Sequence, residues 1–171
     1  MAPPASAEIA SCLALILGSI TLGGGIYETL LVDPAWPRNL SLIQPKLGGL
    51  NRKVFWGLVH PLFELALLVS TWMNWNDLSI RVWLIVALVG HFTGRIWSFA
   101  YFIPSALRFE RLEKLTPEDM RSAHRWVKLS RCVPFLGGAF DSFVGLCAYA
   151  LGKQNRVNDG AYKIRNPPIA G

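Results

Sequence analysis

The chain has 171 residues, of which 52% are hydrophobic and 16% charged, a length that suits one domain and a composition far from that of average soluble proteins. The formal net charge of +6 could indicate a nucleic-acid partner, but the basic residues gather between apolar stretches, where a membrane topology places them. We therefore exclude nucleic acid as a partner and expect a protein that works in the lipid bilayer.

Four stretches are long and apolar enough to cross a hydrocarbon core, which needs about 20 mostly apolar residues per helix. They cover residues 8–32, 54–76, 80–107 and 131–152. The sequence thus predicts an all-α fold, a four-helix transmembrane bundle in a membrane domain over 1–152, followed by a polar tail over 153–171. The remainder is too short for a separate soluble catalytic domain.

Turn and cap residues mark the limits of these stretches. Pro34 and Pro37 predict that the first helix ends there, and Trp36 between them suits the aromatic belt at the membrane interface. The turn between the second and third stretches is short, which makes those helices antiparallel neighbours. Thr116 is a good N-cap with Pro117 at the first helical position, and together they predict a short amphipathic helix before the fourth span.

The basic residues fall mainly in two loops, 33–53 and 106–131. Lysine and arginine are enriched in cytoplasmic loops, so both loops are expected in the cytoplasm and the protein is expected to be multi-pass. Glycines recur within the spans, at Gly23, Gly24, Gly25, Gly90 and Gly94. Small residues let membrane helices approach closely, so these faces could pack within the bundle or form a homo-oligomer.

Six acidic, basic or histidine side chains lie inside the predicted spans, away from the span ends, where a charge costs several kcal/mol and therefore needs a partner or a role. They are Glu28, His60, Glu64, His91, Arg95 and Asp141. At about 1.5 Å of rise per residue, Glu64, Arg95 and Asp141 all lie roughly 15 Å from the cytoplasmic side. His60 lies about one turn nearer the cytoplasm and His91 about one turn farther from it.

These residues also share helical faces. His60 and Glu64 are four residues apart, as are His91 and Arg95, so each pair lies on one side of its helix. The sequence predicts a polar cluster inside the bundle, walled by aromatic side chains, which has the features of a small-molecule site. The competing interpretation is a buried ion pair of Arg95 with Glu64 or Asp141 that only fixes helix register.

Three kinds of chemistry fit such a cluster. Two histidines that are both axial ligands of one haem iron must lie at nearly equal depth, and the estimated offset of His60 and His91, roughly 10 Å, disfavours haem. Iron or manganese could be held by the carboxylates and histidines, although the Glu-x-x-His spacing of di-iron bundles is absent and Arg95 adds positive charge. Without any cofactor, a histidine could deprotonate a carbon acid, Arg95 could stabilise the oxyanion, and the carbanion could react with dioxygen.

Four segments carry a resemblance to a known family: GGGIYETLLVDPAW, FWGLVHP, YFIPSALRF and RWVKLSR. They resemble the small four-helix membrane proteins of the anthrone-oxygenase-like family. The resemblance implies a four-helix fold and, as for members tied to polyketide pathways, oxidation of anthrones to anthraquinones. The family often has an asparagine ahead of the arginine that leads into the fourth helix, whereas this chain has Ser130 before Arg131.

We therefore expect a membrane-embedded oxygenase of secondary metabolism that acts on a flat, lipid-soluble phenolic substrate and needs no cofactor. His60 or His91 would be the general base, Arg95 would stabilise the oxyanion, and Glu64 and Asp141 would orient these groups. The residues expected to bind substrate are Tyr27, Glu28, Trp56, Trp97 and Tyr101. The alternatives are a metal-dependent membrane oxidoreductase, with iron or manganese, and a non-catalytic membrane subunit whose ion pairs set helix packing.

Overall fold

The computed structural model describes residues 5–131. Every regular element in this part of the chain is helical, which confirms the all-α prediction. Residues 132–152 of the predicted fourth span and the predicted tail lie outside the described residues, so the four-helix bundle itself stays a prediction.

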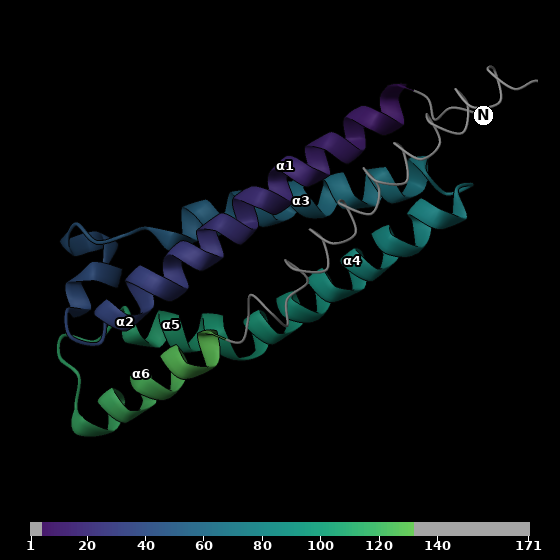
Figure 1. The fold of residues 1–171 in the computed structure, drawn as a ribbon. Helices are drawn as coiled ribbons and strands as arrows, with labels where there is room; N and C mark the ends of the chain where they lie inside the picture. The colour runs from purple at the N-terminus through teal and green to yellow at the C-terminus, as the bar shows by residue number, and fades with distance from the viewer. Residues whose placement is uncertain (1–4, 132–171) are drawn as a thin grey trace, which may run out of the picture.

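Three long helices run side by side (Figure 1), namely α1 (Ala5–Tyr27), α3 (Arg52–Met73) and α4 (Leu78–Trp97). Helix α3 packs between α1 and α4. The Asp77 carboxylate caps α4 by accepting hydrogen bonds from the backbone N–H groups of Ser79 and Ile80, and the short turn before it makes α3 and α4 antiparallel, as predicted. Three helical segments, Ser6–Ala35, Arg52–Met73 and Leu78–Phe109, are long and apolar enough to cross a membrane.

Two of these segments contain a π-helical turn just before a proline. The π-helix η1 (Glu28–Val32) joins α1 to the short α2 (Asp33–Ala35), and η4 (Ser98–Phe102) joins α4 to α5 (Ile103–Phe109). Proline lacks an N–H and its ring crowds the carbonyl four residues back, and a wider π turn relieves both problems. The first helix ends near the two prolines, as predicted, but it continues past Pro34 to Ala35 and stops before Pro37.

One apolar core lies between the long helices around Phe63 and Leu67. A second apolar core lies at the end of these helices where α2, α5 and α6 (Pro117–Ser130) meet (Figure 1). Trp36 is at its centre with 1% of its surface exposed, and its ring centroid is 5.0 Å from that of Phe109 and 5.8 Å from that of Trp126. The prediction that Trp36 lies in the interface belt is wrong, because Phe109 of α5 and Trp126 of α6 pack on it and bury it.

The connecting segments at this end are held by polar contacts. Between α2 and α3 the chain forms two 3-10 helices, η2 (Leu40–Ile43) and η3 (Pro45–Leu47). Gln44 between them donates its side-chain N–H to the carbonyls of Glu110 and Leu112. The two predicted basic loops thus contact each other and lie at one end of the bundle, opposite the α3–α4 turn (Figure 1).

Helix α6 begins as predicted. Thr116 is the N-cap in a capping box, in which its hydroxyl accepts from the backbone N–H of Asp119 and the Asp119 carboxylate accepts from the backbone N–H of Thr116. Hydrogen bonds from the Thr116 side chain and from Arg108 lower the pKa of Asp119. The apolar face of α6 packs on the second core, while Arg121, Arg125 and Lys128 are exposed.

Small residues allow α1 and α3 to approach closely. A Cβ atom at Gly24 would lie 2.8 Å from Cε1 of Phe55, and one at Gly18 would lie 3.2 Å from Cε2 of Phe63. These glycines serve packing within the chain, as small residues do between membrane helices. A homo-oligomer through the glycine-rich faces stays a prediction.

Candidate functional site

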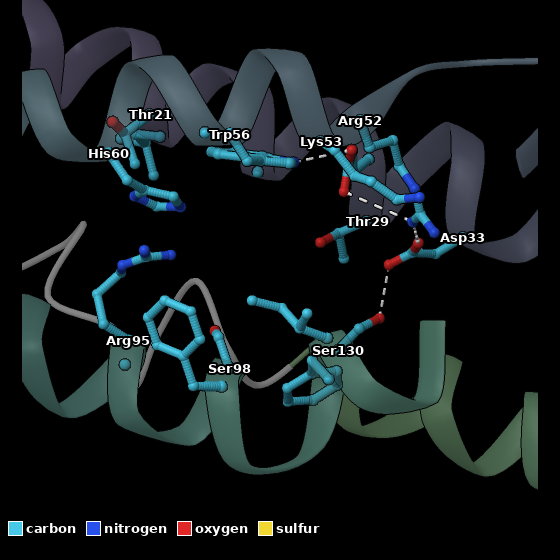
Figure 2. A pocket seen from close by; sticks show the side chains of 18 of the residues that line it. Thr21, Thr29, Asp33, Arg52, Lys53, Trp56, His60, Arg95, Ser98 and Ser130 are labelled. Carbon is cyan, nitrogen blue, oxygen red and sulfur yellow. Dashed lines mark hydrogen bonds and ion pairs between the residues drawn. The ribbon is translucent and has the colours of Figure 1, made fainter. Parts of the chain in front are cut away.

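A cavity of about 480 Å³ lies between α1–η1 and α3 on one side and α4–η4 and α6 on the other. This volume is in the range of ordinary ligand pockets. Apolar and aromatic side chains make up much of the wall, including Trp56, Phe99 and Phe102. The polar residues of the lining are Thr21, Glu28, Thr29, Asp33, Arg52, Lys53, His60, Arg95, Ser98 and Ser130. Figure 2 shows that they gather towards two ends of the cavity, with Trp56 between them.

One end, called here the inner end, is formed by His60 on α3 and Arg95 on α4. Their side chains face each other across the cavity (Figure 2). The Nε atom of Arg95 donates to Oε1 of Glu64 at 3.0 Å, and its guanidinium carbon lies 4.5 Å from the ring centroid of Phe99. Of the five guanidinium N–H donors, only the one on Nε has an acceptor among the described residues. The terminal nitrogens remain available to a ligand.

Glu64 also contacts the second histidine. Its Oε1 atom lies 3.3 Å from Nε2 of His91, so one carboxylate joins the predicted cluster members on α3 and α4. His91 is buried, its ring lies edge-on to Phe63, and it does not line the cavity. The structure therefore brings His60, Glu64, His91 and Arg95 together as predicted, but only His60 and Arg95 reach the cavity.

The predicted depth offset of the two histidines is wrong, since their ring centroids are only 5.4 Å apart. The predicted offset assumes that the helix ends are level, whereas the third segment spans 32 residues and α3 only 22. Unequal depth is therefore no longer an argument against the binding of one iron atom by both histidines. Within residues 5–131, no group of three or more His, Cys, Asp or Glu side chains is placed to hold a metal ion.

His60 has an unusual environment for a buried histidine. Its ring stacks on Trp56, with 4.8 Å between centroids and 22° between planes. Its Nδ1 atom is buried and has no hydrogen-bond partner in the described part of the chain. Such unsatisfied polar atoms are rare in protein interiors. Because this residue lines the cavity, a ligand there could supply the missing partner.

The other end, the outer end, is built around Arg52 on α3. Its Nη1 atom lies 3.8 Å from Oε2 of Glu28 and 3.6 Å from Oδ1 of Asp33. Trp56 donates its indole N–H to Oε1 of Glu28 at 2.9 Å, and the Ser130 hydroxyl donates to Oδ2 of Asp33 at 2.7 Å. These contacts tie η1, α2, α3 and α6 together around one polar cluster (Figure 2).

Sequence reasoning found only part of the outer end. The sequence predicts Glu28 and Trp56 and singles out Ser130, but it places Asp33 and Arg52 in the loop 33–53 between the first two spans. The available signal was an acid directly before a proline at the end of an apolar stretch, with an arginine at the start of the next one.

Three predicted substrate-binding residues do not reach the cavity. Tyr27 and Trp97 are half-exposed on the outside of their helices, and Tyr101 packs edge-on to Phe102. Successive helical residues are turned by about 100°, so Tyr27 cannot face the same way as Glu28, which does line the cavity. Asp141, the fifth predicted catalytic residue, lies outside the described residues.

The chain was compared with protein families, curated proteins and solved structures. No family model matches the chain, and neither a curated protein nor a solved structure matches it.

Proposed function

We propose that the chain is a membrane-embedded oxygenase that acts on a flat, lipid-soluble phenolic carbon acid of the anthrone type. The observation that carries the proposal is the pair formed by His60 and Arg95, which face each other across a cavity lined mainly by apolar, membrane-length helices. A base and an oxyanion-stabilising cation on opposite walls suit proton abstraction next to a carbonyl-bearing ring. The aromatic wall around Trp56 and Phe99 suits a flat ring system.

In the proposed reaction, His60 takes a proton from the methylene carbon of the substrate. The negative charge is delocalised onto the carbonyl oxygen of the substrate, where the terminal nitrogens of Arg95 stabilise it. The carbanion transfers an electron to dioxygen and combines with the resulting superoxide to form a carbon–oxygen bond. The peroxide takes a proton back from the imidazolium of His60 and then loses water, so that one methylene and one dioxygen give one carbonyl and one water.

The remaining cluster members act through this pair. Glu64 holds the Nε side of Arg95 at 3.0 Å and contacts His91 at 3.3 Å, and is therefore a positioning residue. His91 lies against His60 with 5.4 Å between ring centroids and limits the orientations that the base can adopt. Since only His60 lines the cavity, it is the better candidate for the base. Asp141 keeps its proposed orienting role.

Oxygen consumption by the purified full chain in detergent, given a hydroxylated anthrone, tests this function. We expect uptake of dioxygen with formation of the quinone, unchanged by a strong chelator, and a loss of about 10²- to 10⁴-fold in rate for His60→Gln, as for other general bases. His124→Gln is the matched control, because His124 is exposed on α6 and its Nδ1 lies 2.8 Å from the Met120 carbonyl. Activity lost on chelation would instead favour the metal-dependent oxidoreductase.

We further propose that the three described segments each cross the bilayer, with loops 33–53 and 106–131 in the cytoplasm. Their shared end of the bundle and their basic residues support this orientation. In right-side-out membrane vesicles that carry the chain in a cysteine-free background, a cysteine placed by Lys46→Cys should react with an impermeant maleimide only after the vesicles are opened. One placed by Asn76→Cys, in the opposite turn, should react from outside. The reverse pattern would contradict the orientation.

A further inference from the structure

We propose that the outer end of the cavity is a subsite for a ligand hydroxyl group, with Asp33 as its acceptor. The side chain of Asp33 is only 3% exposed, and the residue lines the cavity. Its Oδ1 atom is buried and accepts no hydrogen bond from any described residue. A buried carboxylate oxygen without a donor is costly, and a donor on the ligand would remove that cost.

The neighbours of Asp33 hold the carboxylate in place without satisfying this oxygen. Ser130 donates to the other oxygen, Oδ2, at 2.7 Å. The nearest cation, Arg52, keeps its Nη1 atom 3.6 Å from Oδ1, which is too far for a hydrogen bond. Arg52 is also shared with Glu28 at 3.8 Å and lies 5.7 Å from the ring centroid of Trp126. One oxygen atom of a fixed carboxylate therefore remains for a ligand.

The charges at this end select the kind of group that can bind. Glu28 and Asp33 provide two carboxylates against the single guanidinium of Arg52, while Lys53 is paired with Glu110. The two carboxylates would repel an anionic group, and Arg52 would repel a cationic group at close range. A neutral hydroxyl avoids both conflicts and supplies the one donor that Oδ1 lacks.

The position of the subsite defines where the ligand carries that hydroxyl. Arg52 and His60 are eight residues apart on α3, which corresponds to about 12 Å along the helix axis. A flat ligand that reaches from His60 and Arg95 to Asp33 would therefore carry its hydroxyl on the edge remote from the reacting carbon. The claim that this ligand is a substrate rests on the proposed function. The claim that the outer end recognises a hydroxyl group does not.

The test is a binding experiment, with no turnover, on the purified full chain in detergent. The probes are 2-hydroxyanthraquinone and its methyl ether, 2-methoxyanthraquinone, with dissociation constants measured from the quenching of tryptophan fluorescence. We expect the hydroxyl compound to bind about tenfold or more tightly than the ether, because a hydrogen bond to a charged acceptor is among the stronger ones. The Asp33→Ala variant should bind both compounds with similar affinity.

The control is Asp77→Asn, a change of an acid far from the cavity to another good N-cap residue, which should keep the full preference for the hydroxyl compound. Equal affinity of the two probes for the unaltered protein, or no binding of either, would overturn the subsite. A preference that survives in Asp33→Ala would overturn the role of Asp33. A protein that prefers the hydroxyl compound but never consumes oxygen would retain the subsite and refute the oxygenase.

Discussion

Replacing Arg95 by leucine should destabilise the folded protein by roughly 3–5 kcal/mol, the usual effect of removing one partner of a buried ion pair. The side chains of Arg95 and Glu64 are only 17% and 23% exposed. Leucine would leave Glu64 with a negative charge that, within residues 5–131, only His91 contacts. The measurement is the midpoint of unfolding in mixed micelles with increasing SDS. Arg81→Leu is the control, because Arg81 lies at the far end of α4 over the ring of Trp75.

The double variant Arg95→Leu with Glu64→Leu should recover most of this stability, because an apolar pair can replace a buried ion pair at little cost. His91 would then lose a single hydrogen-bond partner. Oxygen uptake should remain lost in the double variant, since the oxyanion would still lack Arg95. If the double variant were both stable and fully active, the ion pair would serve only helix packing and the non-catalytic subunit would be the better interpretation.

Replacing Trp36 by alanine should cost about 3–5 kcal/mol, as for other buried large aromatic residues. Trp36 is 1% exposed and packs against Phe109 and Trp126, so its removal leaves a large void where α2, α5 and α6 meet. Unfolding in SDS micelles again provides the measurement. Trp72→Ala is the matched control, because Trp72 is 78% exposed and its truncation should cost far less.

The same substitution should weaken the outer end of the cavity. Helix α6 carries Ser130, which donates to Asp33, and α6 is held on α2 largely by the core around Trp36. An unchanged stability in Trp36→Ala would contradict the assignment of this residue to the core and would return it to the membrane interface.

The helical class, the three apolar segments and the cap of α6 could be predicted from the sequence because they depend on local patterns. Apolar length identifies the spans, and Thr116 with Asp119 forms a local cap that needs no distant partner. The gathering of Glu64, His91 and Arg95 in one polar cluster could be predicted as well, because spacing by four residues places His60 with Glu64, and His91 with Arg95, on one face of each helix.

The errors arise where the result depends on packing between distant segments. The depth of His91 relative to His60 depends on how far α4 continues beyond the start of α3, which no single helix reveals. Trp36 has the composition of an interface residue, and only the contact of α6 buries it. Asp33 could not be assigned to the cavity from the sequence, because a proline alone does not show whether a helix ends or widens.

The π turn η1 changes which way the end of the first membrane-length segment, Ser6–Ala35, faces. A π turn accommodates one more residue than an α turn, so the residues after it are rotated by about 100° relative to an uninterrupted helix. A helical wheel drawn from Ala5 therefore loses its phase within η1 (Glu28–Val32). Asp33 and Trp36 follow that break, and it is this change of phase that turns one towards the cavity and the other into the second core.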